Sequence, residues 1–372
     1  MKFIASTSSL LKHLQIISGV ISTNNVLPIL EDFLFVIKEG KLTVFSTDLE
    51  TSMSTSIDVE AKEDGHIAIP AKILIETLKT LPEQPITFSM DLSTNAVELT
   101  SSNGKYKLVG ENGDDYPKIP VAEDVNDIQI PATILNGAIN NTIFATSNDE
   151  LKPAMAGVYV QIDDSGSTFV ATDAHKLVRF KHTQTKSSQA SSFILPKKAL
   201  NLLKTALPED DTAISVSYNN ANAFFTFGDI NLICRLIDAR YPDYKAVIPT
   251  DNPNHLNISR KEFLNTIKRI SIYSNKTTHQ VLLKISGSEL QISAKDLDFS
   301  NEANERLTCQ YEGSDIEIGF NAKFLVEMLS VLDSNEIRLE LSAPTRAGVI
   351  FPAEQTENQE ILMLIMPVML NA

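Results

Sequence analysis

The sequence has few of the residues that form covalent cross-links or metal centres. Its 372 residues include two cysteines, Cys234 and Cys309, which are too few for a disulfide framework or a four-cysteine metal site. It has no run of 18 or more apolar residues, so we expect no membrane span. The N-terminal MKFIASTSSLLKHLQ lacks the apolar stretch and cleavage site of a signal peptide. We therefore expect a cytoplasmic protein with no metal, no other cofactor and no membrane partner.

Motifs of common catalytic and nucleotide-binding sites are also absent. The chain contains no GxxxxGK[ST], GxGxxG, HExxH or GxSxG sequence, and its six histidines do not have metal-ligand spacing. Asp173 and His175 are spaced like a catalytic pair, but their place just after a strand-like segment favours a structural or peptide-contacting role. A DNA- or RNA-processing enzyme with a repeated α+β core is the main alternative. It would need clustered carboxylates or an activated nucleophile, and the sequence shows neither. We predict no catalytic residues and no enzyme activity.

What the sequence does contain is a pattern that occurs three times. Three helix-like segments, aligned on Lys72, Lys198 and Lys323, each carry Leu two and nine residues downstream. A second marker follows a strand-like apolar run in each third of the chain and reads STDL at 46–49, ATDA at 171–174 and AKDL at 294–297. Two markers in the same order at nearly the same spacing indicate a triplication.

The repeat predicts the fold class and the domain organisation. We expect an α+β protein of three domains, residues 1–125, 126–252 and 253–372, each with two helices packed on a mostly antiparallel sheet. The 3.6-residue periodicity and the repeat predict helices over residues 7–20, 71–81, 132–147, 197–207, 260–272 and 321–332. Short β-rich segments at Phe33–Ile37 and Lys41–Phe45 flank a turn at Glu39 and Gly40. A monomeric scaffold without DNA fits the same repeat.

Charge is distributed unevenly between these helices and the rest of the chain. The chain holds 32 basic and 47 acidic residues, and its net charge of −15 by itself argues against a nucleic-acid partner. The six expected helices, however, hold eleven Lys or Arg and three Glu, although the 132–147 helix carries no charge. This segregation favours a basic surface for nucleic-acid phosphates, with an acidic remainder that repels them. Because no base-reading motif is present, we expect contacts with the backbone, without sequence specificity.

Several segments resemble one family, the bacterial sliding clamp or beta subunit of DNA polymerase III. VATDAHKL at 170–177 is similar to its VATDGHRL, RLI at 235–237 and RYPDY at 240–244 to its RLI and RYPDY, and LIMP at 364–367 to its C-terminal MP motif. The similarity covers essentially the whole chain. It implies a head-to-tail homodimer that closes as a ring of six DNA-clamp domains around double-stranded DNA. Such a ring slides without sequence specificity and tethers the replicative polymerase.

The resemblance also implies partners and three groups of site residues. The partners are the polymerase catalytic subunit, the clamp loader, and other proteins with a clamp-binding motif, such as translesion polymerases, mismatch-repair proteins and ligase. Contacts with DNA are expected from Lys12, Lys72, Lys197, Lys198, Arg260 and Lys268. A partner-peptide pocket between domains 2 and 3 is expected from Met155, Thr172, Ala174, His175, Lys176, Leu177, Pro242, Val247, Leu364, Met366, Pro367, Val368, Met369 and Leu370. In the dimer interface, Tyr106 and Leu108 would face Ile272 and Tyr273.

The sequence departs from the family pattern at several of these positions. Ala174 replaces the usual Gly, Lys176 the usual Arg and Met369 an Arg, while Ala246 stands where a basic residue is common. Asn24 replaces an Arg of some relatives, which weakens one possible DNA contact. We therefore expect fewer charged hydrogen bonds to a bound peptide and a preference for more apolar peptides.

Overall fold

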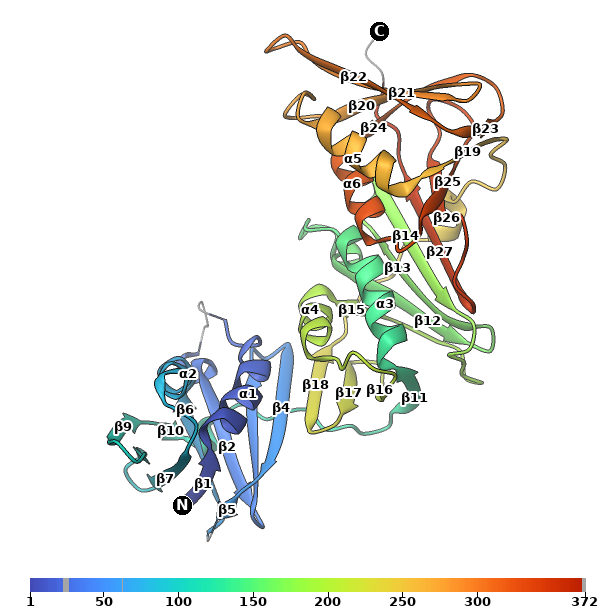
Figure 1. The fold of residues 1–372 in the computed structure, drawn as a ribbon. Coiled ribbons are helices and arrows are strands. Elements are labelled where there is room, and N and C mark those ends of the chain that lie inside the picture. The colour runs from blue at the N-terminus through green and yellow to red at the C-terminus, as the bar shows by residue number, and fades with distance from the viewer. Residues whose placement is uncertain (23–26, 62, 370–372) are drawn as a thin grey trace. The chain divides into compact units, whose positions relative to one another are not determined.

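The structure, a computed structural model, describes residues 1–22, 27–61 and 63–369. Asn24 and Leu370 lie outside the described residues. Backbone contacts divide the chain into two units (Figure 1). Unit 1 comprises Met1–Asn136 with Lys198–Leu236, and unit 2 comprises Gly137–Lys197 with Ile237–Ala372. Among the described residues, no helix is long and apolar enough to cross a membrane.

The order of helices and strands repeats three times. The first third contains β1 (Lys2–Ser6), α1 (Thr7–Ser18), β2 (Asp32–Lys38), β3 (Lys41–Thr47), β4 (Thr51–Asp58), β5 (Glu60–Ala61), β6 (Gly65–Pro70), α2 (Ala71–Thr80), β7 (Pro85–Asp91), β8 (Ala96–Thr100), β9 (Lys105–Val109) and β10 (Glu111–Asn112). The second contains β11 (Asn126–Pro131), α3 (Ala132–Thr142), β12 (Gly157–Asp163), β13 (Gly166–Thr172), β14 (Lys176–His182), β15 (Ser191–Pro196), α4 (Lys197–Ala206), β16 (Ala213–Tyr218), β17 (Asn222–Phe227) and β18 (Ile230–Arg235). The third contains β19 (Asn254–Ser259), α5 (Arg260–Ser271), β20 (Gln280–Ser286), β21 (Glu289–Asp296), β22 (Asn301–Thr308), β23 (Gln310–Glu312), β24 (Ile316–Asn321), α6 (Ala322–Val331), β25 (Glu336–Leu341), β26 (Gly348–Pro352) and β27 (Gln359–Ile365).

These elements confirm the predicted triplication and the position of each predicted helix. The 132–147 segment is the one that differs in kind, because its α-helix ends at Thr142 and continues as a 3-10 turn over Ile143–Ala145. The predicted strand pair around Glu39 and Gly40 is β2 and β3, with Lys38 opposite Lys41. The α+β fold class is therefore confirmed.

Side-chain caps explain where two of the helices begin. Ser6 Oγ accepts a hydrogen bond from Ser9 N at the start of α1, at 3.3 Å. Ser259 Oγ accepts one from Glu262 N at the start of α5, at 3.4 Å, in the Ser-x-x-Glu spacing of a capping box. The buried residues of α1 recur every three or four positions, and those of α5 lie between Phe263 and Ile270 on one side of the helix, so one face of each helix is buried and the other is left for charged side chains.

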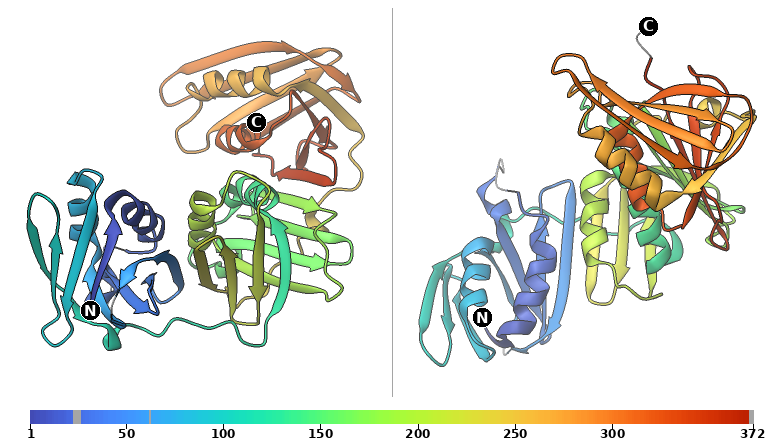
Figure 2. Two further views of the ribbon diagram at one scale, coloured as in Figure 1. Left: turned by 60° about the horizontal axis from the view of Figure 1, so that its bottom comes forward. Right: turned by 45° about the horizontal axis from the view of Figure 1, so that its top comes forward.

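Unit 1 contains two antiparallel sheets. One has the strand order β5-β1-β7-β8-β9, and the other has the order β10-β6-β2-β3-β4-β18-β17-β16-β11. The second sheet joins the first and second thirds of the chain because β4 pairs with β18, with Thr51 opposite Cys234. Helix α1 packs on β3 and β4 and helix α2 on β2 and β6, so the two helices lie side by side on this sheet (Figures 1 and 2).

Unit 2 has the corresponding arrangement for the rest of the chain. Its two sheets have the strand orders β15-β12-β13-β14-β27-β26-β25-β19-β23 and β22-β21-β20-β24. The larger sheet is continuous because β14 pairs with β27 from Lys176 opposite Ile365 to His182 opposite Gln359. Helices α5 and α6 pack against each other (Figure 2). This pairing of β14 with β27 brings together the segments that the sequence predicts to form a peptide pocket.

Candidate functional site

A tight turn between β13 and β14 positions the first group of predicted pocket residues. Thr172 Oγ1 donates a hydrogen bond to Lys176 O at 2.7 Å and accepts one from Ala174 N at 3.1 Å. Asp173 Oδ1 accepts hydrogen bonds from His175 N and Lys176 N, both at 2.9 Å. Ala174 has a φ of 77°, a left-handed conformation that glycine adopts more readily. The turn therefore exposes Ala174 and His175 and directs Lys176 into the protein.

The Lys176 side chain is buried beside two carboxylates rather than lying at a surface open to peptides. Its Nζ is 2.8 Å from Asp173 Oδ2 and 3.1 Å from Glu327 Oε2 on α6. The same Nζ lies 4.2 Å from the ring centroid of Phe324, a cation–π contact. The ring of His175 stacks on Phe324 with the centroids 6.2 Å apart. Two carboxylates thus compensate the one cation, which leaves Lys176 with little charge to offer a ligand.

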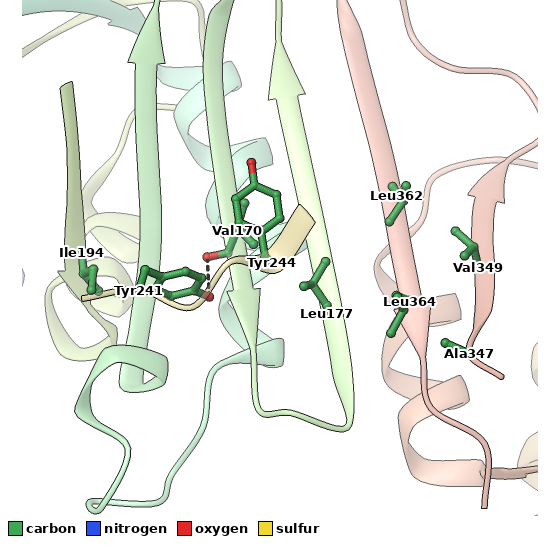
Figure 3. Packing of buried hydrophobic residues seen from close by; sticks show 9 residues of the cluster. All are labelled: Val170, Leu177, Ile194, Tyr241, Tyr244, Ala347, Val349, Leu362 and Leu364. Atoms are coloured by element: carbon green, nitrogen blue, oxygen red, sulfur yellow. Dashed lines mark hydrogen bonds between the residues drawn. The ribbon is translucent and has the colours of Figure 1, made fainter. Parts of the chain in front are cut away.

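Apolar side chains from the joined sheet form a buried cluster beside this turn. Figure 3 shows its members on β13, β14, β15 and the Tyr241–Tyr244 segment, and on β26, β27 and the segment before β26. Tyr241 donates a hydrogen bond from its hydroxyl to Val170 O at 3.3 Å. The cluster consists of Val170, Leu177, Ile194, Tyr241, Tyr244, Ala347, Val349, Leu362 and Leu364. Of the predicted pocket residues, Leu177 and Leu364 belong to this cluster.

Other predicted pocket residues leave apolar surface exposed in the same unit. The exposed ones are Pro242, Val247, Met366 and Met369, and the half-buried ones are Met155, Pro367 and Val368. Exposed methionine and valine next to a buried apolar cluster suit a surface that adapts to related peptides.

The segment after β27 is held by backbone hydrogen bonds at two points. Met366 N donates to His175 O at 2.9 Å, next to the turn described above. Val368 N donates to Gly319 O on β24 at 2.8 Å. The structure therefore places Met366 beside His175, as the prediction of a shared site requires. Leu370, also a predicted member, lies outside the described residues.

Sequence reasoning missed several residues of this region. Tyr241, Tyr244, Ala347 and Val349 belong to the apolar cluster, and Glu327 pairs with Lys176. The RYPDY motif already contained the two tyrosines. By contrast, the contact with Glu327 depends on how α6 packs, which has no signal in the sequence around Lys176.

Three of the predicted DNA-contacting residues are exposed on helices. Lys12 on α1, Lys72 on α2 and Lys268 on α5 point away from the buried helix faces. Within the part of the chain that the structure describes, none of the three is in an ion pair. They are therefore available to anions from solution.

The other three predicted DNA-contacting residues have partners within the protein. Lys197 Nζ donates to Asn148 Oδ1 at 3.0 Å. Lys198 Nζ donates to Val20 O at 2.8 Å and forms an ion pair with Asp48. Arg260 donates from Nε to Ser334 O at 2.6 Å and from Nη1 to Leu329 O at 2.9 Å. Any contact with a phosphate has to compete with these bonds.

The predicted interface residues lie on or beside two outer strands. Tyr106 and Leu108 lie half-buried on β9, which is the last strand of its sheet in unit 1. Ile272 and Tyr273 are exposed just after α5 in unit 2, where β22 is the first strand of its sheet. The outer strands β9 and β22 both have backbone groups that can pair with another strand.

Titratable groups do not suggest catalysis. Burial raises the pKa of the Cys234 thiol to about 12, so this cysteine is an unreactive core residue. Burial also lowers the pKa of His13, whose Nδ1 lies 2.6 Å from Thr55 Oγ1. Among the described residues, no group of three or more His, Cys, Asp or Glu could hold a metal ion.

Models of one protein family match nearly the whole chain. The N-terminal, central and C-terminal domains of the DNA polymerase III beta subunit match residues 1–120, 129–243 and 245–369, respectively. The beta sliding clamp of Synechococcus elongatus is 27% identical, with all of both chains covered. The beta sliding clamp of Bacillus subtilis is 26% identical, with 99% of both chains covered.

Solved structures agree with this match. The structure is similar to the crystal structure of the DNA polymerase sliding clamp from Bacillus subtilis, with a TM-score of 0.95 at 25% identity over all of both chains. It is also similar to a sliding clamp from Pseudomonas aeruginosa bound to griselimycin, with a TM-score of 0.94 at 25% identity and complete coverage of both chains.

Proposed function

The chain belongs to the DNA polymerase III beta subunit family, the beta sliding clamps, and we propose that two copies form a head-to-tail ring around double-stranded DNA. The family consists of processivity factors and not of catalytic enzymes. The three clamp domains would span residues 1–125, 126–252 and 253–372. The ring would work in the cytoplasm, where it would encircle the duplex and hold a polymerase at its template.

The observation that carries this proposal is a strand pairing that occurs twice in equivalent form. Each pairing joins one third of the chain to the next, and we call it a joint. At the first joint, β4 follows a turn that contains Asp48. This strand pairs with β18, the last strand of the second third. At the second joint, β14, the strand after the Asp173 turn, pairs with β27, the last strand of the third. The strand that corresponds to β4 and β14 in the last third is β22, which follows Asp296. The strand that corresponds to β18 and β27 in the first third is β9, its last long strand. Both are outer strands of their sheets, and pairing them between two copies would close the ring.

The first joint also suggests a register for this pairing. Thr51, the first residue of β4, lies opposite Cys234. Cys234 is the next-to-last residue of β18 that pairs with β17. The residue in the position of Cys234 is Leu108, the next-to-last residue of β9 that pairs with β8. The residue in the position of Thr51 is Asn301, the first residue of β22. If Asn301 lies opposite Leu108, Glu302 lies opposite Lys107. Opposite charges in facing positions favour this pairing.

Contact with DNA would be weak and independent of sequence. The exposed Lys12, Lys72 and Lys268 would interact with phosphates through solvent-screened attraction. A closed ring cannot leave the duplex sideways, so it needs no tight contact to stay bound. Weak contacts without a preferred register would then permit sliding.

The exposed apolar surface around the cluster in unit 2 would bind linear peptides of partner proteins. These partners would include the replicative polymerase catalytic subunit, the clamp loader, translesion polymerases, mismatch-repair proteins and ligase. Tethering to the ring would raise the effective concentration of a polymerase at the template. Because Asp173 and Glu327 already neutralise Lys176, acidic peptide residues would gain little there, and apolar peptides would bind more tightly. Equal affinity of acidic and apolar variants in a competition assay would contradict this preference.

The experiment that tests the ring compares circular and linear DNA. We expect the protein, once loaded on a nicked circle, to stay bound and to slide off after the circle is cut. Loss at the same rate from both forms would contradict a ring. The triple variant Lys12→Glu/Lys72→Glu/Lys268→Glu should load poorly and be retained for a shorter time. The matched triple variant Lys38→Glu/Lys41→Glu/Lys284→Glu, which reverses exposed charges on strands, should behave like the parent.

A further inference from the structure

Two large apolar side chains are exposed on the turn between β21 and β22. The side chains of Leu297 and Phe299 are 78% and 71% exposed, respectively, although they lie only two residues apart. Exposing two such neighbours to water is costly unless another surface covers them.

Hydrogen bonds join this turn to the segment after α5. Asn275 Nδ2 donates to Asp298 Oδ2 at 3.2 Å. Asp298 N donates to Asp296 Oδ1 at 3.1 Å, which fixes the turn itself. Ile272 and Tyr273, three and two residues before Asn275, are also exposed. We define Leu297, Phe299, Ile272 and Tyr273 as the turn patch.

The corresponding turns at the two joints within the chain contact the end of the paired strand. Glu50 O, on the turn before β4, accepts a hydrogen bond from Arg235 N at 2.8 Å. His175 O, on the turn before β14, accepts one from Met366 N at 2.9 Å. In both cases the donor immediately follows the last residue of the partner strand that pairs with the strand after the turn. A turn of this kind therefore lies against the end of the strand that joins its sheet.

We propose that Leu297 and Phe299 pack against Leu108 and Val109 of a second copy of the chain and extend the contact between the two subunits. This inference rests on the proposed head-to-tail ring, in which the turn before β22 meets the end of β9. Val109, the last residue of β9, is itself exposed.

A cavity beside β9 adds to the fit. It has a volume of about 400 Å³, and its lining includes the apolar side chains of Met1, Met90, Val97 and Leu108. Charge favours the same occupant, because β9 carries Lys105 and Lys107 and no acidic residue, whereas β22 carries Glu302 and Glu305 against one basic residue, Arg306. An apolar side chain from the turn patch would fill space that the first unit leaves open next to its outer strand.

Dimer dissociation measured by sedimentation velocity over a dilution series tests the proposal. We expect Leu297→Asp/Phe299→Asp to raise the dimer Kd at least tenfold, and Phe299→Leu to leave it within about threefold of the parent. The matched control is Leu151→Asp, at an apolar side chain that is 90% exposed outside the turn patch, and it should leave the Kd unchanged. Circular dichroism of each variant shows whether its subunit is folded.

Failure of this inference and failure of the ring give different results. If Tyr273→Asp raises the dimer Kd and Leu297→Asp/Phe299→Asp does not, the role of the turn is overturned and the ring is kept. A parent that stays monomeric at all concentrations would overturn both. As a second measurement, Phe299→Cys/Val109→Cys should form a disulfide-linked dimer on oxidation, and Leu151→Cys/Val109→Cys should not. Absence of the cross-link in a protein that does dimerise would also overturn the proposal.

Discussion

The turn at residues 47–51 in unit 1 and the turn at 172–176 in unit 2 have the same backbone structure and different ion pairs. Asp48 Oδ1 accepts hydrogen bonds from Glu50 N and Thr51 N at 3.0 and 2.6 Å, just as Asp173 Oδ1 accepts two from its own turn. The second carboxylate oxygen of Asp48 pairs with Lys198 on α4, whereas that of Asp173 pairs with Lys176 inside the turn. The shared Thr-Asp pair thus binds a cation of different origin in the first and second thirds of the chain.

The two lysines also differ in burial, which sets how much each ion pair contributes. The side chain of Lys198 is 43% exposed, whereas that of Lys176 is 6% exposed and contacts a second carboxylate, Glu327. Exposed pairs contribute little because water screens them, and buried charges depend on their partners. We therefore expect the second joint to be far more sensitive to loss of its lysine.

Replacing the buried lysine should have the largest effect. Lys176→Met leaves Asp173 largely buried without its cation, and we expect a loss of about 3 kcal/mol in the local free energy of unfolding. Hydrogen exchange of the β14 and β27 amides measures this, because a protein of several domains need not unfold in one step. The control Lys181→Met changes a lysine on the same strand that forms no ion pair with any residue that the structure describes. Equal protection in the two variants would contradict a stabilising role of the ion pairs that Lys176 forms with Asp173 and Glu327.

The next effect concerns a buried carboxyl in the first third, at a position where the second third has a glycine. Asp32 begins β2 opposite Pro70, and Gly157 begins β12 opposite Pro196 in the corresponding position of the second third. Burial, with Glu111 and Glu31 nearby, raises the pKa of Asp32 to about 7. Its Oδ2 has no hydrogen-bond partner among the described residues. The folded protein keeps a proton that the unfolded chain releases, so Asp32 lowers stability as pH rises from about 4 to about 7.

Asp32→Asn should remove this loss of stability. We expect the variant to be more stable than the parent by about 2 kcal/mol at pH 8, with little difference at pH 4. Urea unfolding followed at several pH values measures the difference. Asp58→Asn, at an exposed residue that ends β4, is the control. A parent and a variant with parallel pH profiles would show that Asp32 is charged in the folded protein.

A smaller effect should follow from relieving the strained turn residue. Ala174 has a φ of 77° and Leu49, its equivalent in the first turn, a φ of 78°. Ala174→Gly should raise stability by about 1 kcal/mol, because glycine adopts this conformation without a steric penalty. Thermal unfolding measures the change, and Ala213→Gly at the start of β16 should lower stability instead. A lower melting temperature for Ala174→Gly would mean that its methyl group makes contacts worth more than the strain.

The smallest effect is expected at the exposed ion pair of the first joint. Lys198→Met should change the exchange protection of β4 and β18 by less than about 1 kcal/mol, and added salt should reduce the difference. Lys204→Met, at an exposed lysine on the same helix, is the control. If Lys198→Met and Lys176→Met had equal effects, burial would not explain the difference between the two joints.

The helices and the aspartate turns could be predicted from sequence because their interactions are local. Apolar spacing and the serine cap of α5 act within a few residues, and the repeated Thr-Asp pair forms its hydrogen bonds within its own turn. Most residues of the peptide surface were predicted from motifs that resemble those of a known family. The apolar cluster beneath it includes Ala347 and Val349, which reach Leu177 only through the pairing of β14 with β27.

The sequence by itself determined the threefold repeat, the order of strands and helices and the concentration of basic residues on helices, because these are properties of neighbouring residues. Only the tertiary structure decided which lysines are exposed and which are bound. Lys72 and Lys198 are each the second residue of equivalent helices, yet Lys72 is in no ion pair among the described residues, whereas Lys198 is held by Asp48 and Val20 from another third of the chain. Contacts between residues distant in sequence depend on how sheets join, and no local pattern encodes that pairing.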